Sequence, residues 1–119
     1  MLITIPVSVG ELLDKITILM LKYEHSKNIE VGKELDKLSI IAKEFNVLND
    51  EFVQVLYYVN LILWNIEDAL RELEKENEFS EEFIDLARSV YKTNDMRSKI
   101  KKEINKFYGS EITEYKFYK

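Results

Sequence analysis

The three arginines of this chain, Arg71, Arg88 and Arg97, are the residues whose type and placement most clearly suggest chemistry. The chain has fourteen lysines, so cationic positions are usually filled by lysine. A guanidinium group differs because its rigid fork of N–H donors matches a carboxylate with two parallel hydrogen bonds. The partner is either a carboxylate of the protein or an anionic ligand.

Arg97 lies within a helical stripe that should face a hydrophobic core. The stripe keeps the alternating spacing of three and four residues that is typical of packed helices, and it interrupts the apolar positions with Thr93 and Arg97. Its members are Phe83, Leu86, Val90, Thr93, Arg97, Ile100, Ile104 and Phe107. Because an unpaired buried charge is very costly, we expect an acidic partner opposite Arg97. We expect it among Glu24, Glu67, Asp68 and Asp95.

Similar apolar stripes predict four helices in all. Ser8–Glu11 has the form of a capping box, so the first helix should begin near Val9. Asn49 or Asp50 should cap the third helix, and the fourth should open at Ser80. The first three stripes are Val9, Leu12, Ile16, Leu19 and Tyr23; Val31, Leu35, Leu38, Ala42 and Phe45; and Phe52, Leu56, Val59, Leu63, Ile66, Leu70 and Leu73.

Short connections between these helices favour an all-α, antiparallel up-and-down four-helix bundle that forms a single domain over residues 1–119. Gly109 should end the last helix. The termini, "LITIPV" and "EITEYKFY", are predicted to be short extended segments, which pair either as a two-stranded ribbon or with those of a neighbouring subunit.

Counting residues from the turn near Phe79 predicts a polar belt at mid-height of the bundle. Its members are Glu24, Trp64, Glu67, Asp68, Arg71, Arg88, Tyr91, Asn94, Asp95 and Arg97. The belt is either an internal arginine–carboxylate network or a pocket for an anionic small molecule. The candidate ligand-binding residues are Lys15, Trp64, Asp68, Arg71, Arg88, Tyr91, Asn94, Asp95 and Arg97.

Composition excludes several classes of function. The chain has no cysteine and one histidine, His25, so it lacks the ligands of most zinc and di-iron sites, and we assign no metal or cofactor. A net charge of −5 argues against non-specific nucleic-acid binding. Neither a secretory signal nor a membrane-spanning run is present, which predicts a cytoplasmic protein without a membrane partner.

The sequence does not decide whether the protein is an enzyme. The helical chorismate mutases hold a dicarboxylate with arginine and lysine, and Lys15 and the three arginines could take those roles, although their spacing does not demand it. The all-α nucleoside triphosphate pyrophosphohydrolases bind Mg²⁺ between facing acidic helices. Here the Glu11/Asp14 and Glu82/Asp85 pairs should lie at opposite ends. A binding or assembly module is favoured, and a small enzyme acting on an anionic metabolite is the alternative.

Helix lengths also predict self-association. The last two helices should span about 27 residues and the first two about 18, so the long hairpin should project by roughly 13 Å. Apolar residues on this projection would lack cover: Leu70, Leu73, Phe79, Phe83 and Leu86. The run from Val53 to Trp64 is also apolar around most of its circumference. We therefore expect a homodimer built on the third and fourth helices.

Four long motifs, "VSVGELLDKITIL", "LWNIEDALRELE", "FIDLARSVYKTNDMRSKIKKEIN" and "GSEITEYKFY", resemble a family of small bacterial and viral proteins catalogued as a domain of unknown function. Members occur near glycosyltransferase-type genes, which is the basis for a sugar-nucleotide variant of the enzyme alternative. The resemblance carries over Glu11, Asp14, Lys15, Trp64, Glu67, Asp68, Arg71, Arg88, Tyr91, Asn94, Asp95, Arg97, Asn105, Ser110, Glu114, Lys116 and Tyr118. The sequence departs from the family pattern at Met20, Asn65, Ala69 and Met96, where charged residues are usual.

Overall fold

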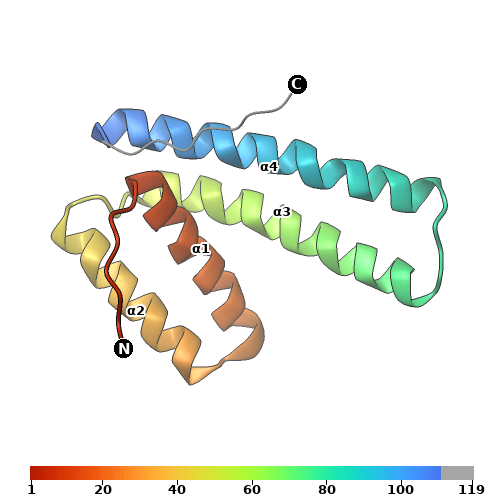
Figure 1. Ribbon diagram of the computed structural model, residues 1–119, viewed down its shortest axis with the longest axis horizontal. Helices are drawn as coiled ribbons and strands as arrows, with labels where there is room; N and C mark the ends of the chain where they lie inside the picture. The colour runs from red at the N-terminus through yellow and green to blue at the C-terminus, as the bar shows by residue number, and fades with distance from the viewer. Residues whose placement is uncertain (111–119) are drawn as a thin grey trace.

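The computed structural model describes residues 1–110 and contains four helices in that range (Figure 1). They are α1 (Val9–Ser26), α2 (Ile29–Glu44), α3 (Asp50–Lys75) and α4 (Glu81–Tyr108). No strand occurs within residues 1–110, so the predicted all-α four-helix bundle with two unequal hairpins is confirmed. The predicted ribbon needs the second terminal segment, "EITEYKFY", which lies entirely outside the described residues.

Local signals at the helix ends act largely as the sequence predicts. The Ser8 hydroxyl accepts a hydrogen bond from the Glu11 N–H at 3.1 Å. The Asn49 side chain likewise caps α3 by accepting from the Phe52 N–H at 3.1 Å. Gly109 ends α4 in the left-handed region with φ 63°, a conformation that glycine adopts without a steric penalty. These caps set the residues at which α1 and α3 begin and α4 ends.

The two hairpins meet at an angle, with the shorter α1/α2 hairpin lying across one end of the longer α3/α4 hairpin (Figure 1). α1 contacts both α3 and α4, whereas α2 contacts only α1 among the other helices. The crossing means that α1 meets α4 only near the beginning of α1. Side chains further along α1 turn instead toward α3, as the hydrogen bond from Tyr57 to Glu24 shows.

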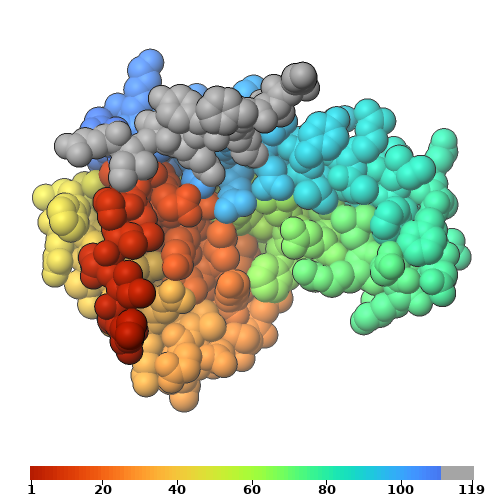
Figure 2. Space-filling view, in the orientation of Figure 1, coloured from red at the N-terminus to blue at the C-terminus, as the bar shows by residue number. Residues whose placement is uncertain are grey.

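The hydrophobic core lies at the end where the hairpins meet. It is built from Leu13, Ile16, Ala42, Val47, Leu56 and Ile104, which come from all four helices and the α2–α3 connection. No side chain from residue 64 to residue 92 is buried. Figure 2 shows this outer part of the long hairpin projecting beyond the remainder of the molecule. We call residues 72–92, around the α3–α4 turn, the hairpin arm.

Phe45 and Phe107 are the most exposed members of the apolar stripes, contrary to their place in the apolar pattern. Phe45 is 72% exposed and Phe107 is 68% exposed. Phe45 is the C-cap of α2, a helix with a single helical neighbour, and Phe107 packs edge-on against Phe52 at 5.3 Å between ring centroids. In the described part of the chain, no helix combines the length and apolar character needed to cross a membrane.

Candidate functional site

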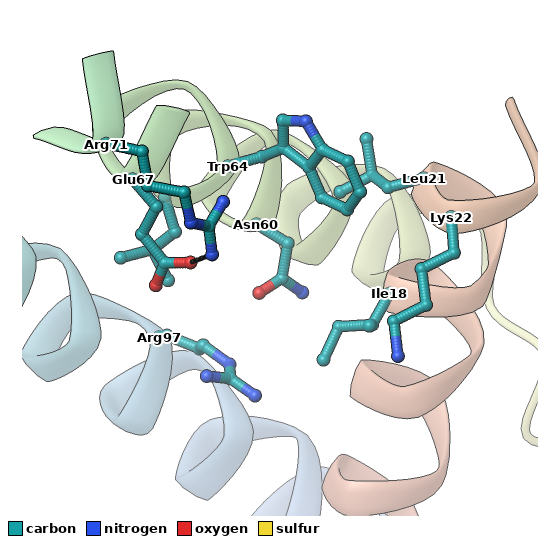
Figure 3. A pocket seen from close by; sticks show the side chains of 9 residues that line it. Ile18, Leu21, Lys22, Asn60, Trp64, Glu67, Arg71 and Arg97 are labelled. Carbon is teal, nitrogen blue, oxygen red and sulfur yellow. Dashed lines mark ion pairs between the residues drawn. The ribbon is translucent and has the colours of Figure 1, made fainter. Parts of the chain in front are cut away.

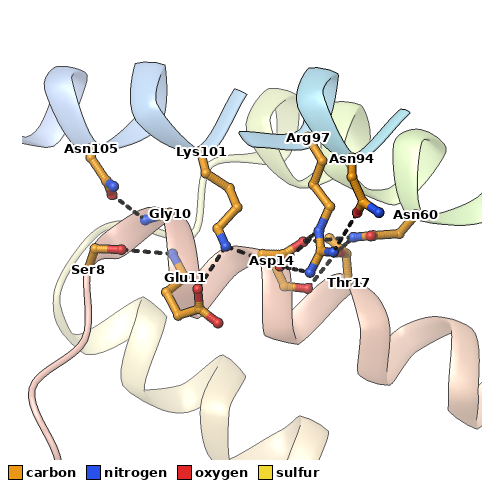
Figure 4. Close-up of polar contacts among 10 residues, drawn as sticks. All are labelled: Ser8, Gly10, Glu11, Asp14, Thr17, Asn60, Asn94, Arg97, Lys101 and Asn105. Carbon is orange, nitrogen blue, oxygen red and sulfur yellow. Dashed lines mark hydrogen bonds and ion pairs between the residues drawn. The ribbon is translucent and has the colours of Figure 1, made fainter. Parts of the chain in front are cut away.

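Arg97 is paired with a buried carboxylate, as its place in the apolar stripe predicts. Its Nε donates to Asp14 Oδ1 at 3.0 Å, and its Nη2 donates to Asp14 Oδ2 (Figure 4). Asp14 is 1% exposed, whereas the Arg97 side chain keeps 26% of its surface accessible. The expectation of Glu24, Glu67, Asp68 or Asp95 as the bidentate partner was wrong, because the inclined hairpins bring the beginning of α1 to this level of α4.

Asp14 is the centre of a polar cluster that joins three helices. Asn60 Nδ2 donates to Asp14 Oδ1 at 2.9 Å and to Thr17 Oγ1 at 2.8 Å. Lys101 Nζ lies 3.7 Å from Asp14 Oδ2 and donates to Glu11 Oε2 at 2.8 Å (Figure 4). We call this group the Asp14 cluster: Glu11, Asp14, Thr17, Asn60, Arg97 and Lys101.

The Asp14 cluster balances its own charge. It holds two cations and two carboxylates, and the Lys101 side chain is only 5% exposed. Each buried charge therefore has an opposite charge within contact distance, which is the arrangement that makes burial tolerable. The cluster also explains why Glu11 does not complete its capping box, since its carboxylate faces Lys101 instead of turning back to Ser8.

A close approach of α1 to α4 sets the register of this cluster. A Cβ atom at Gly10 would lie 2.7 Å from the Lys101 carbonyl oxygen, so only glycine fits there. The first N–H groups of α1 are satisfied by α4 and the residues after it. Val9 N donates to Ser110 Oγ at 3.1 Å and Gly10 N to Asn105 Oδ1 at 2.7 Å.

A hollow of about 390 Å³ opens beside the Asp14 cluster, between α1, α3 and α4 (Figure 3). Its size lies within the range of small-molecule sites. We call it the junction pocket, and its lining is Ile18, Leu21, Lys22, Asn60, Leu63, Trp64, Glu67, Arg71 and Arg97. Asn60 and Arg97 belong to both the pocket and the cluster, so the cluster holds part of the pocket wall in place.

The cations of the pocket differ in how firmly they are held. Arg71 pairs with Glu67 at 3.7 Å and with Asp68 at 3.3 Å, but all three side chains are at least half exposed. Exposed pairs of this kind contribute little, so Arg71 can exchange partners easily. Lys22 has no ion-pair partner among residues 1–110. Arg97, by contrast, is fixed by Asp14 and by Asn94 Oδ1 at 3.3 Å.

Trp64 forms one apolar wall of the pocket and is itself held by a stacked ring. The His25 imidazole lies 4.4 Å from the Trp64 ring between centroids, at an interplanar angle of 28°. His25 Nδ1 lies 2.8 Å from the Leu21 carbonyl oxygen, which anchors the imidazole to the end of α1. Trp64 Nε1 is buried and has no hydrogen-bond partner among residues 1–110. The indole is therefore set in place by packing.

The predicted candidate residues divide between the pocket and other surfaces. Trp64, Arg71 and Arg97 line the pocket together. The other six candidates, Lys15, Asp68, Arg88, Tyr91, Asn94 and Asp95, are not part of its lining. Lys15 faces α2 and pairs with Glu34 at 3.5 Å, and Arg88 lies exposed on the hairpin arm.

The sequence did not predict Lys22 as part of the pocket, nor the grouping of Asp14, Asn60 and Lys101. Asn60 carried a usable signal, because it is the one amide within the apolar run "VLYYVNLILW". A buried amide requires hydrogen-bond partners, so a polar cluster could have been placed opposite it. Lys22 carries no such signal, since it lies on α1 among other exposed charged residues.

A second hollow of about 1150 Å³ lies between the N-terminal segment, α1 and α2. Its apolar floor includes Ile5, Leu12 and Leu38. The charges on its rim neutralise one another locally, as in the 3.6 Å pair of Lys33 and Glu30. The junction pocket, whose three cations come from three helices, is therefore the better candidate site for an anion.

Residues 1–110 contain no group of three or more His, Asp or Glu residues suited to hold a metal ion.

The model of a family described as "Family of unknown function (DUF6165)" matches residues 3–119. No curated protein and no solved structure matches the chain. The match spans almost the whole chain, including all four helices.

Proposed function

We propose that this chain, which belongs to the DUF6165 family, is a binding module that holds a small anionic molecule in the junction pocket. The observation that carries the proposal is the convergence of Lys22, Arg71 and Arg97 on one hollow (Figure 3). They come from α1, α3 and α4 respectively. Cations from three helices around a concave apolar surface are typical of a site for a small anion.

The Asp14 cluster supports this proposal by holding Arg97 before a ligand arrives. A bidentate contact with Asp14 fixes the plane of the guanidinium group. Pre-organisation favours binding because less conformational freedom is lost when the ligand binds. Arg71 supplies the complementary property, since its exposed pairs with Glu67 and Asp68 can be given up for a ligand.

A thermal-shift screen tests the proposal most simply, because a ligand that binds only the folded state raises Tm. The screen should contain nucleotides, sugar nucleotides, dicarboxylates and small monocarboxylates. We expect at least one anion to raise Tm, and the rise should shrink in Arg71→Met. Arg88→Met is the matched control, because Arg88 lies outside the pocket lining. A rise of equal size in both variants would place the anion elsewhere and contradict the proposal.

We propose assembly as a second function, carried by α3 together with the hairpin arm. Phe79 and Ile84 are 54% and 53% exposed, and on α3 Tyr58 and Ile62 are 55% and 46% exposed. A second copy covering α3 and α4 would bury these side chains, and a two-fold homodimer is the usual form of such an assembly. Sedimentation at micromolar concentration tests this idea. A dimer that dissociates in Phe79→Ser supports it, whereas a clean 14.2 kDa species contradicts it.

A further inference from the structure

We infer that the junction pocket receives the tip of the hairpin arm of a second copy of this chain, with Phe79 as the side chain that enters it. The inference rests on both proposed functions, because it gives the assembly a docking site and gives the pocket a protein occupant that competes with small anions. We call residues 74–85 the arm tip.

The arm tip carries the net charge of the protein. Residues 74–85 hold six carboxylates and one lysine, a net charge of −5, which equals the net charge of the whole chain. The carboxylates are those of Glu74, Glu76, Glu78, Glu81, Glu82 and Asp85, and none of them has an ion-pair partner among residues 1–110. Charges of one sign gathered around an exposed turn repel one another, so a surface with available cations would stabilise them.

An aromatic pair lies in the middle of this acidic segment. Phe79 is 54% exposed, and its ring packs edge-on against that of Phe83 at 5.2 Å between centroids. Phe79 belongs to the turn between α3 and α4 and follows Glu78 directly in the chain. An exposed phenyl ring beside carboxylates matches an apolar hollow with cations at its edge, because the ring leaves water while the opposite charges pair.

The junction pocket offers both complements of the arm tip. Its volume of about 390 Å³ has room for a phenyl ring, since a cavity of roughly 150 Å³ already holds benzene. Trp64 and Leu63 supply apolar wall, and Lys22 supplies an ammonium group without an ion-pair partner among residues 1–110. Arg71 has enough N–H donors to keep its contact with Glu67 while it binds a carboxylate of the second copy.

The shape of the molecule lets two copies exchange their arm tips. α1 and α2 extend to one side of the long hairpin, and the space beside the arm on that side is open (Figure 1, Figure 2). The pocket lies at the corner of this space, between α1 and α3. A second copy, rotated by half a turn about an axis perpendicular to the view of Figure 1, would lay its arm antiparallel in the open space. Pocket and tip are equally far apart in both copies, so each tip reaches the pocket of the other.

The exposed residues between pocket and tip suit an antiparallel arrangement. Glu74 and Lys75 lie midway in the sequence between Arg71 of the pocket and Glu78 of the tip, and all four are exposed. Antiparallel arms would place Arg71 beside Glu78 of the second copy, and Glu74 beside its Lys75. Opposite charges would therefore face each other along the arms, whereas parallel arms would bring identical charges together.

A mixing experiment tests the inference with two variants that each lack one half of the contact. Arg71→Glu alters the pocket and keeps the tip, whereas Phe79→Ser alters the tip and keeps the pocket. In sedimentation, each variant alone should dimerise more weakly than the unaltered protein by roughly tenfold or more, because a central contact is lost twice in each dimer. An equal mixture should associate more tightly than either variant alone, since each heterodimer regains one intact tip in one intact pocket. Lys37→Glu, the same charge change on α2, is the matched control and should leave dimerisation unchanged.

The outcomes of this experiment separate the inference from the proposals on which it rests. Undiminished dimerisation of both variants, or two weakened variants whose mixture does not associate, would overturn the inference and leave assembly to another face. An unaltered protein that stays at 14.2 kDa at micromolar concentration would overturn the inference and the assembly proposal together, and would leave the anion pocket intact.

Trp64 is the only tryptophan of the chain, so its fluorescence reports whether the pocket is occupied. Its emission in the unaltered protein should change on dilution in step with dissociation of the dimer. Phenylacetate joins an aromatic ring to a carboxylate, as the tip does, and should dissociate the dimer at concentrations at which acetate has no effect. If phenylacetate changed the Trp64 emission of Phe79→Ser without dissociating the unaltered dimer, the pocket would bind anions but not the tip, and the inference would be wrong.

Discussion

The end where the two hairpins meet and the hairpin arm are built from the same two helices, α3 and α4, but they differ in what surrounds those helices. At the meeting end, α1 covers both helices, and Leu56 and Ile104 are fully buried. In the arm, α3 and α4 are not covered by another helix of residues 1–110, and no side chain of residues 72–92 is buried. Coverage by α1, more than helix propensity, therefore separates a stable base from a weakly packed arm.

The polar residues follow the same division. Arg97 and Lys101 at the base are held by Asp14 and Glu11 on another helix. Within residues 1–110, Arg71, toward the arm, pairs only with acids three and four residues away on its own helix. The first kind of contact determines how helices are placed, and the second contributes little to stability. The junction pocket lies on the border, where a fixed guanidinium and a movable one face the same hollow.

The largest predicted effect comes from removing the central charge of the base. Asp14→Asn should lower the free energy of unfolding by about 3 kcal/mol or more, because it removes the buried carboxylate that contacts both Arg97 and Lys101. Arg97→Met should cost less, since Asp14 keeps its contacts with Lys101 and Asn60. Urea denaturation measures both, and Asp68→Asn is the exposed control, which should change stability by less than about 0.5 kcal/mol. Equal losses for Asp14→Asn and Asp68→Asn would contradict a buried pair.

A pair of identical substitutions on α3 compares the two regions directly. Leu56→Ala at the base should cost about 2–5 kcal/mol, because Leu56 is fully buried and its removal leaves a cavity. Leu73→Ala in the half-exposed arm should cost about 1 kcal/mol or less in the monomer. Both are read from chemical denaturation at low protein concentration. If Leu73→Ala proved as costly as Leu56→Ala, the arm would be packed as well as the base.

Substitutions at two glycines of the short hairpin test how strongly the close contact between α1 and α4 constrains the fold. Gly10→Ala should destabilise the protein by about 1–3 kcal/mol, since the new Cβ would lie 2.7 Å from a backbone oxygen of α4. Gly32→Ala is the matched control, because its Cβ would meet only the edge of the Tyr23 ring at 3.0 Å. Alanine favours a helix over glycine by roughly 0.5–1 kcal/mol, so Gly32→Ala should be neutral or stabilising. Thermal denaturation of the two variants distinguishes these outcomes.

The smallest effect concerns the far end of α1 and appears only at alkaline pH. The hydrogen bond that Tyr57 donates to Glu24, together with burial and the charge of Glu24, raises the pKa of Tyr57 above 10.0. A raised pKa stabilises the fold fully below pH 10 and loses this contribution as pH rises through the folded-state value. Stability measured against pH should therefore fall less above pH 10 in Tyr57→Phe than in the unaltered protein. Parallel curves for the two proteins would show that the bond adds nothing.

Much of the fold was predictable because it depends on local signals. Ser8, Asn49 and Gly109 set helix ends through their own side chains or backbone. The charge partner of Arg97 was predictable only as a kind of residue. Its identity as Asp14 depends on how the hairpins cross, which Gly10 helps to set through a contact between residues about ninety positions apart. A contact between residues so far apart in the chain does not produce a regular spacing pattern from which it could be predicted.

The pocket was predictable to a similar extent. Trp64, Arg71 and Arg97 could be grouped because a single hairpin brings them together, so counting from its turn suffices. Lys22 could not be added, because its place depends on the angle at which α1 leaves α4. Arg88 lies outside the pocket lining for a related reason, since no part of α1 extends over the arm.

The most direct test of the account is a map of amide chemical shifts recorded by NMR on the Phe79→Ser variant, whose pocket is free of the arm tip, while phenylacetate or phenyl phosphate is added. We predict that the shifted signals include the Trp64 indole N–H and the Asn60 side-chain amide, with neighbours on α1 and α3. Signals from residues 76–90 of the hairpin arm should stay in place. Shifts confined to the arm, or to the hollow beside Ile5 and Leu38, would contradict the assignment of the junction pocket as the binding site.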